Sequence, residues 1–485
     1  MSTLAASISS LLVLGLAPGP HAEHAEHVAA RPKPSDPGAF VRAPRDPSAA
    51  TYTSWVYGYY AFWAGTVGEI RWDRVSHVAL FDVELKSTGA FDNEYLITDV
   101  IDEALALAEP YGARVHISAI CFDDVTMSAV LPDPIKRGIG IDQLVALVAD
   151  TGAHGVSIDY EGMDAVNILD LVTFVEELKA ALPPGQDEVT VATPAIDWSS
   201  AYHYPKLAAA ADALFIMGYG YHWSGGNPGP VAPLHGGDPW SKYSLEWTLD
   251  DYLATGAPAD KLVMGLPLYG HNWPTVDTSV PGESTGKSKS ITYADAVVEA
   301  ETYGRKWDAV THTPYYFPAG DAQVWYDDAA SLEDKITWSI GQGMLGVGFW
   351  ALNYEGGDPV FWDMVAEHTQ SADEPTTTGG DTTGGTDGSG GAGTDGSGGT
   401  GTGGSAGSGT DGTSGGSGSG GSASGGSGGA GTESGTSDAG TSDASATGGG
   451  GEEDEGCGCS AAPRPAGWLG LGLFGLAFAR RRARR

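Results

Sequence analysis

The feature that most constrains the fold of this chain is a series of eight short apolar runs between residues 51 and 370. Stretches with apolar residues at three- and four-residue spacing, typical of helices, separate most of these runs. Near-continuous apolar runs are typical of parallel strands that are buried on both faces. Strands that alternate with helices in this way predict an α/β fold, a closed (β/α)8 TIM barrel. The eight runs are residues 55–62, 76–83, 114–122, 155–160, 189–196, 212–219, 261–270 and 346–352.

Two further features refine this expectation. The segment between the seventh and eighth runs, residues 271–345, is longer than the others, and we expect a small insertion there, beside the upper face of the barrel. Neither a GxGxxG nor a GxxxxGK[ST] motif opens a helix, so the sequence does not favour a nucleotide-binding protein.

Composition separates the expected barrel from a long tail. The 73 glycines are concentrated between Ser371 and Gly451, where large apolar side chains are almost absent. Such a stretch cannot bury enough surface to offset the entropy lost on ordering, so we expect residues 371–455 to be a disordered linker rich in Gly, Ser and Thr. Residues 51–370 remain as one large domain.

Both ends of the chain carry sequence patterns that are typical of exported proteins. Residues 1–22 contain a short apolar run followed by PGPHA, and we expect a signal peptide there even though no Lys or Arg precedes the run. Residues 23–50 then form an N-terminal linker. Residues 456–485 combine a short apolar stretch with a final Arg cluster. That stretch is shorter than the roughly 20 residues of a spanning helix.

This C-terminal tail resembles the MYXO-CTERM sorting tails of myxobacterial surface proteins, in which a Cys, a short hydrophobic helix and an Arg cluster follow one another. The resemblance implies export and processing by a sorting protease near Cys457 or Cys459. It further implies attachment to the outer membrane at the cell surface, or secretion after the tail is processed. A simple C-terminal membrane anchor is the alternative, and in both interpretations only the tail meets the membrane.

The charge and the cysteines limit the other partners. A formal net charge of -37 argues against nucleic acid or an anionic membrane surface as the main partner. Solubility outside the cell is the simpler explanation of the acidity. Cys121 is the one cysteine within residues 51–370, so an internal disulfide is excluded there, and the three cysteines do not suggest a metal site.

Two carboxyl groups lie at the end of the fourth apolar run. Residues 154–162 read HGVSIDYEG, and the two-residue period of a strand directs Ser157, Asp159 and Glu161 toward the barrel interior. Active residues of such barrels lie at the carboxyl ends of strands. Two carboxyl groups about 7 Å apart by strand rise do not both ionise easily in a partly dry site, so one can act as a general acid. Two acids that cap helices or face solvent are the alternative.

The HGVSIDYEG stretch resembles the DxxDxDxE signature of glycoside hydrolase family 18, the chitinases and related endo-N-acetylglucosaminidases. Three more segments are similar to later strands of that family and occur in the same order. They are FIMGYGYHW at 215–223, KLVMGLPLYGHNW at 261–273 and GVGFWALNYEG at 346–356. The resemblance covers essentially all of residues 51–370.

The resemblance also implies roles for the matched residues. Glu161 matches the general acid, and Asp159 matches the residue that orients the N-acetyl group of the substrate and stabilises the oxazolinium intermediate. Tyr219 matches the tyrosine that hydrogen-bonds the acetyl carbonyl, and Trp350 matches the aromatic floor below the sugar at the cleavage point. The family is substrate-assisted and uses no second carboxylate as nucleophile. We therefore expect no metal, no organic cofactor and a monomeric catalytic domain.

Three positions depart from the family pattern. The first Asp of the signature is His154 here, its middle Asp is Ser157, and the Asp of the M-x-Y-D segment is Gly220. By parity His154 faces away from the pocket, so its change is expected to be structural. Ser157 faces the pocket and can donate a hydrogen bond to Asp159. The spore-cortex and peptidoglycan branch of the family also tolerates a residue other than an acid at that position.

Further substrate-binding candidates follow other strands. Asp197 and Asp82 are the candidates to replace the carboxylate lost at Gly220, whereas Met217 is interpreted as a core residue. Flat aromatic faces stack on sugar rings, although most aromatic residues simply pack in a core or at a rim. The aromatic residues that we expect to contact sugar, besides Trp350, are Tyr59, Trp223 and Trp273.

Two functions remain open from the sequence. The first is an exported, surface-attached hydrolase of β-1,4-linked N-acetylglucosamine polysaccharide, with chitin and peptidoglycan as alternatives and peptidoglycan slightly favoured by Ser157. The second is a catalytically weak or inactive family 18 protein that only binds glycan. Gly220 favours the second function, and the intact set of Glu161, Asp159 and Tyr219 opposes it.

Overall fold

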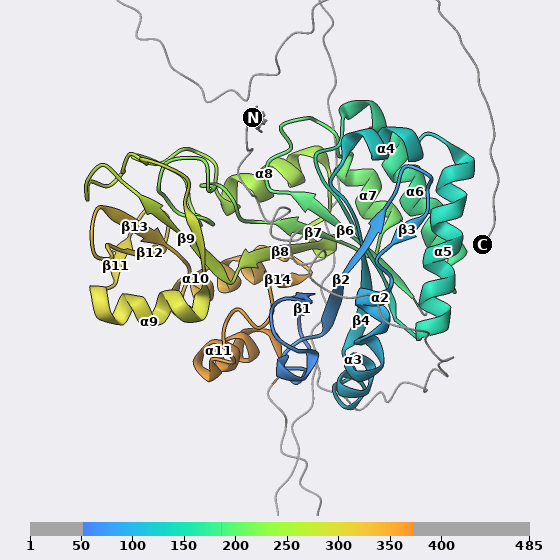
Figure 1. The fold of residues 1–485 in the computed structure, drawn as a ribbon, viewed down its shortest axis with the longest axis horizontal. Helices are drawn as coiled ribbons and strands as arrows, with labels where there is room; N and C mark the ends of the chain where they lie inside the picture. The colour runs from blue at the N-terminus through green and yellow to red at the C-terminus, as the bar shows by residue number, and fades with distance from the viewer. Residues whose placement is uncertain (1–51, 186, 372–485) are drawn as a thin grey trace, which may run out of the picture. The chain divides into compact units, whose positions relative to one another are not determined.

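The computed structural model describes residues 52–371 except residue 186, and these residues form the predicted barrel with its insertion (Figure 1). Each predicted apolar run contains one parallel barrel strand. The predicted signal peptide, the N-terminal linker, and the linker and sorting tail beyond residue 371, with Cys457 and Cys459, lie outside the described residues. The barrel strands are β1 (Trp55–Ala61), β2 (His77–Leu85), β4 (Arg114–Cys121), β5 (Gly155–Tyr160), β6 (Glu188–Pro194), β7 (Ala213–Met217), β8 (Leu262–Pro267) and β14 (Gly346–Trp350).

The barrel closes through its first strand. The strands follow one another around the sheet in the order β1-β14-β8-β7-β6-β5-β4-β2. Strand β1 pairs in parallel with β14 on one side and with β2 on the other, which completes the ring. A short strand, β3 (Phe91–Asp92), pairs antiparallel with the end of β2.

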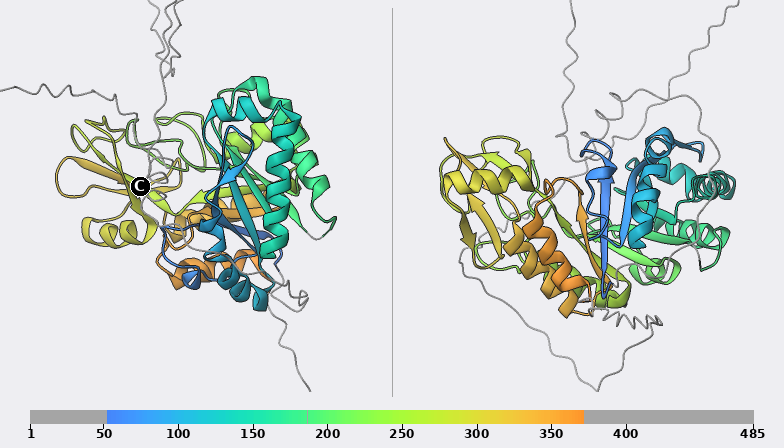
Figure 2. Two further views of the ribbon diagram at one scale, coloured as in Figure 1. Left: turned by 45° about the vertical axis from the view of Figure 1, so that its right-hand side comes forward. Right: turned by 90° about the horizontal axis from the view of Figure 1, so that it is seen from below.

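Helices cover the outside of the barrel (Figures 1 and 2). Local sequence sets their ends: the Asp133 carboxylate accepts hydrogen bonds from the first N–H groups of α5, and Gly152 ends that helix with φ 76°. Among the described residues no helix is both long and apolar enough to cross a membrane. The helices are α2 (Tyr95–Thr98), α3 (Ile101–Ala108), α4 (Asp124–Val130), α5 (Pro134–Thr151), α6 (Ile168–Ala181), α7 (Tyr204–Ala210), α8 (Leu245–Thr255), α10 (Ala329–Gly341) and α11 (Pro359–Thr369).

The predicted insertion is a small antiparallel sheet with one helix, and it stands to one side of the barrel (Figure 2). Its strands run in the order β10-β9-β13-β12-β11. Strand β9 begins two residues after β8 ends, so the sheet starts directly at the carboxyl end of a barrel strand. The elements are β9 (Tyr269–Pro274), β10 (Lys289–Thr292), α9 (Tyr293–Tyr303), β11 (Lys306–Asp308), β12 (Thr313–Tyr316) and β13 (Ala322–Trp325).

The predicted alternation along β5 is confirmed. Val156, Ile158 and Tyr160 belong to the apolar layer between the barrel and its helices. Ser157 points the other way, and its hydroxyl is 2.8 Å from the hydroxyl of Tyr59 in the barrel interior. The interior core around Tyr59 is aromatic and includes Phe215, so the column that ends in Asp159 and Glu161 stands on a tightly packed base.

A charged network fills the lower, amino-terminal end of the barrel. One carboxylate oxygen of Glu188 lies 2.7 Å from Nε of Arg114, 3.2 Å from Nε2 of His77 and 3.1 Å from Nε2 of His116. Burial opposes ionisation of Glu188, but the hydrogen bonds from the two histidines prevail and lower its pKa. Burial lowers the pKa of His77 to about 4. Glu188 therefore balances the buried Arg114 guanidinium.

Removing the Glu188 charge should destabilise the fold. In Glu188→Gln the Arg114 guanidinium stays buried without its counter-ion, and we expect the free energy of unfolding to fall by about 3 kcal/mol. Glu333→Gln is the matched control, because that carboxylate is half exposed and forms an ion pair with the partly exposed His368. It should change the free energy of unfolding by less than about 1 kcal/mol. Urea unfolding measures both, and equal values for the two variants would contradict this role.

Candidate active site

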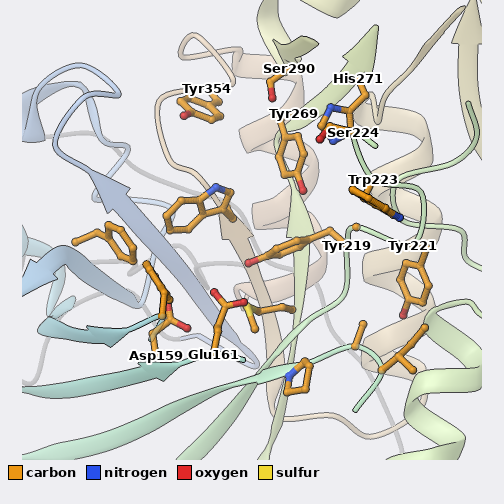
Figure 3. Close-up of a pocket in the computed structure, with 18 of the residues that line it drawn as sticks. Asp159, Glu161, Tyr219, Tyr221, Trp223, Ser224, Tyr269, His271, Ser290 and Tyr354 are labelled. Carbon is orange, nitrogen blue, oxygen red and sulfur yellow. The ribbon is translucent and has the colours of Figure 1, made fainter. Parts of the chain in front are cut away.

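A cavity of about 510 Å³ opens at the carboxyl ends of the barrel strands, between the barrel and the first strands of the insertion. Figure 3 shows how side chains from both parts converge on it. Five of the predicted site residues line this cavity: Asp159, Glu161, Tyr219, Trp223 and Trp350. The remaining lining is largely aromatic or uncharged, as is common in carbohydrate clefts.

Asp159 is the most strongly perturbed acid of the pocket. It is the last inward-facing residue of β5, only 5% of it is exposed, and its Oδ1 has no hydrogen-bond partner among the described residues. Burial raises its pKa well above the ordinary value, and the nearby charges of Glu161 and Asp82 raise it further. Asp159 therefore keeps its proton to a higher pH than an ordinary aspartate does.

Glu161 follows directly on the strand and reaches the pocket. Its backbone N–H donates a hydrogen bond to the carbonyl of Cys121, 2.9 Å away, which continues the pairing of β5 with β4 beyond the regular sheet. Figure 3 shows the carboxyl group of Glu161 directed into the cavity, on the side where the hydroxyl of Tyr219 approaches. A proton donor placed there can reach a substrate oxygen held in the pocket.

Tyr219 supplies a neutral hydroxyl opposite the two acids. Burial raises its pKa well above the ordinary value, and Tyr269, Asp159 and Glu161 raise it further, so the hydroxyl remains a hydrogen-bond donor. The ring of Tyr219 meets that of Tyr269 at 6.1 Å and 75°. This edge-to-face contact fixes the orientation of the hydroxyl.

Trp350 forms an aromatic wall at the end of β14. Its ring lies 4.9 Å from that of Phe81 and 5.8 Å from that of Tyr59, so the interior core supports it from below. Tyr59 itself is almost fully buried and does not line the pocket. Its hydroxyl pairs with Ser157, so Ser157 also lies below the pocket and contacts Tyr59. The expected hydrogen bond from Ser157 to Asp159 is absent among the described contacts.

Two other predicted substrate contacts also lie outside the pocket lining. Trp273 is fully buried in the core of the insertion, with its ring 5.1 Å from that of His271. Asp197 accepts hydrogen bonds from the backbone N–H groups of Ala201 and Tyr202, so it fixes the turn after β6. Trp273 thus packs within the insertion and Asp197 holds a turn, and the order of the strands along the sequence does not reveal either role.

The three departures from the family signature have different consequences. His154 lies at the lower end of β5, where its Nδ1 accepts a hydrogen bond from the N–H of Val115, as expected of a structural residue. Gly220 lines the pocket with φ 77°, and no heavy atom would lie within 4 Å of an added Cβ. Asp82 is fully buried and raises the pKa of Asp159. Asp82, and not Asp197, is therefore the third acid that acts on Asp159.

Several lining residues were not anticipated. Met217, interpreted as a core residue, lines the pocket, because β7 ends there and its side chain remains partly exposed. Tyr269, His271 and Ser290 come from the insertion, whose fold the sequence did not specify. Trp198 also lines the pocket. It follows Asp197 just after the predicted strand 189–196, and this position at a strand end was the sequence feature that could have indicated a pocket residue.

One group of described residues has the spacing of a metal site. The ligand atoms of His77, His116 and Glu188 lie within 4.8 Å of one another. Arg114 contacts the same carboxylate oxygen as both histidines, however, and its positive charge disfavours a cation there. This cluster lies at the end of the barrel opposite the pocket, and we assign it a structural role.

Comparison with known proteins identifies the barrel. Residues 123–355 match the family model of the glycosyl hydrolases family 18. The barrel belongs to glycoside hydrolase family 18. The matched range contains the pocket residues Asp159, Glu161, Tyr219 and Trp350.

Two relatives and one solved structure are similar to this chain. The chain is 26% identical over 297 residues to the sporulation-specific glycosylase YdhD of Bacillus subtilis, and the match covers 57% of this chain and 66%, just under two thirds, of that protein. It is 27% identical over 321 residues to di-N-acetylchitobiase of Rattus norvegicus, covering 59% of this chain and 83% of the relative. A group IV chitinase structure from Ostrinia furnacalis shares the fold, with a TM-score of 0.60, 18% identity, and coverage of 65% of this chain and 98% of that one.

The raised pKa of Asp159 predicts a stability effect that depends on pH. An unfolded aspartate ionises near pH 3.9. The native state therefore loses stability as pH rises from that value toward the raised pKa of Asp159. Asp159→Asn has no charge to bury, so its free energy of unfolding at pH 8 should exceed that of the native protein, and it should unfold at a higher temperature there. The difference should largely vanish at pH 4. Calorimetry at both pH values measures it, and an equal difference at both would contradict the buried-acid assignment.

Proposed function

We propose that this protein is a retaining glycoside hydrolase that cleaves β-1,4-linked N-acetylglucosamine polysaccharide with assistance from the substrate. The observation that carries this proposal is the convergence of a buried, proton-retaining Asp159 with Glu161 and Tyr219 in one aromatic pocket. A protein that only binds glycan would have no use for a buried acid whose Oδ1 has no hydrogen-bond partner among the described residues.

In the proposed first step, Glu161 gives its proton to the glycosidic oxygen while the acetamide oxygen of the same substrate sugar attacks the anomeric carbon. The bond from that carbon to the leaving oxygen breaks, and an oxazolinium ion forms. The positive charge of that ion favours the ionised form of Asp159, whose proton passes to solvent. The Asp159 carboxylate then accepts a hydrogen bond from the acetamide N–H and balances the charge, while the Tyr219 hydroxyl donates to the acetyl oxygen. Glu161, now a carboxylate, takes a proton from a water molecule while that water attacks the same carbon. The bond from the acetamide oxygen to this carbon breaks and the acetamide is restored, so two inversions retain the configuration.

The pocket favours an uncharged polymer over an anionic one. Its lining in the described structure contains Asp159 and Glu161 but no Lys or Arg, so a sugar carboxylate would gain no ion pair there. Ser157, the residue on which the sequence slightly favoured peptidoglycan, lies below the pocket and is not among the residues that line it. We therefore propose chitin-type glycan as the first substrate class. Peptidoglycan is the second candidate, since one relative is a sporulation-specific glycosylase.

We also propose that the enzyme acts outside the cytoplasm, attached to the cell surface through its C-terminal tail. The supporting sequence features are residues 1–22 and 456–485, both outside the described residues. A Gly-rich tether would let the barrel reach external polymer, because the reach of such a linker grows with the square root of its length.

Replacing the proposed general acid tests the enzymatic function. Glu161→Gln keeps the size of the side chain but removes the transferable proton, so the release of reducing ends from chitohexaose should fall about 10²- to 10⁴-fold. Glu246→Gln, an exposed carboxylate on α8, is the matched control and should retain full activity. The same assay on purified peptidoglycan shows from which of the two polymers reducing ends are released faster.

Two results would speak against this proposal. If the native protein and Glu161→Gln release no reducing ends from either polymer but both bind them, the glycan-binding alternative holds. If Glu161→Gln stays as active as the native protein, Glu161 is not the general acid.

A further inference from the structure

Two exposed tryptophans stand at the pocket. Trp198 is 74% exposed and Trp223 is 54% exposed, more than any other aromatic side chain of the described residues. Both line the cavity that contains Asp159 and Glu161. Exposed apolar surface of this size carries a free-energy cost that a ligand covering it removes. Trp223 was expected to contact sugar from its sequence position, whereas no role follows from the sequence for Trp198.

Trp198 is supported by a row of aromatic contacts outside the pocket. Its ring lies 5.1 Å from that of Tyr243 at 71°, and Tyr243 lies 4.8 Å from Trp247 at 85°. The ammonium group of Lys242 lies 5.2 Å from the Tyr243 ring and 5.3 Å from the Trp247 ring, which ties these two rings together. Edge-to-face contacts hold an exposed ring in place while leaving much of its surface accessible.

The loop that carries Trp198 is also anchored to the catalytic strand. Asp197 fixes the turn by accepting two backbone hydrogen bonds, one of them from Tyr202. The hydroxyl of Tyr202 donates to the carbonyl of Tyr160, the residue before Glu161, at 2.5 Å. The position of Trp198 is therefore fixed relative to Glu161, as a binding surface for a substrate under cleavage requires.

We propose that Trp198, held by Tyr243 and Trp247, is a second stacking platform that binds the glycan strand where it leaves the cleavage pocket. This inference rests on the proposed function. The occupant is glycan because the platform is continuous with an aromatic pocket, and because the exposed face of an indole stacks on the C–H surface of a sugar ring. The platform makes the enzyme favour strands long enough to cover both the pocket and Trp198, and so favours cleavage within polymers.

The ratio of two rates tests this platform. For the native protein and Trp198→Ala, kcat/KM is measured on chitohexaose and on a fluorogenic chitobioside, which occupies fewer sugar positions than the hexamer. Trp198→Ala should lower the ratio of the hexamer value to the chitobioside value about tenfold. Tyr243→Ala should lower it less, and Tyr243→Phe, which keeps the ring, should not change it. Tyr111→Ala, another exposed aromatic residue in the turn before β4, is the control and should leave both rates unchanged.

A binding measurement separates failure of the platform from failure of the proposed function. Calorimetry compares chitohexaose binding to Glu161→Gln with binding to Glu161→Gln combined with Trp198→Ala. Weaker binding by the combined variant supports the platform even if neither polymer is cleaved. An unchanged rate ratio together with unchanged hexaose binding would overturn it, and Trp198 would then be a surface for a different partner.

Discussion

The structure depends on the closure of eight parallel strands, because closure fixes which side of β5 faces inward. The strand period of two then directs Ser157 and Asp159 to the interior, and Glu161 follows at the pocket. A shift of one residue in the register of β5 would turn this whole column toward the helices. Aromatic packing around Tyr59 below Ser157 opposes such a shift and supports Trp350 beside the acids.

The buried carboxyl groups at the two ends of the barrel have opposite electrostatic surroundings. At the lower end, Glu188 is surrounded by Arg114 and two histidines, so its negative charge is balanced and the network supports the fold. At the upper end, Asp159 is buried beside Glu161 and Asp82, with no cationic side chain lining the pocket in the described part of the chain, and its pKa rises. Stability is thus concentrated at one end and reactivity at the other, as is typical of enzymes on this fold.

The sequence predicted the barrel, its eight strands and the acid pair, because apolar runs and strand parity are local properties of the chain. It could not predict which polar side chains form hydrogen bonds within the protein and are therefore not free to contact a substrate. Ser157 lies on the inward face of β5 and Asp197 follows β6, two positions typical of catalytic residues. Tyr59 and the backbone after β6 nevertheless occupy their hydrogen-bonding groups. Contributions from the insertion, such as Tyr269, depend on how β9 folds back to the pocket, which no local pattern encodes.

The central claim of the proposed function is that cleavage proceeds in two steps through an intermediate, with Glu161 as the proton donor, so that the configuration of the anomeric carbon is retained. The most direct test is the configuration of the first product, followed by proton NMR within minutes of adding chitohexaose and before mutarotation. The account predicts that the new reducing end appears as the β-anomer, the configuration of the bond that was cleaved. Initial appearance of the α-anomer would show direct attack by water and would contradict it.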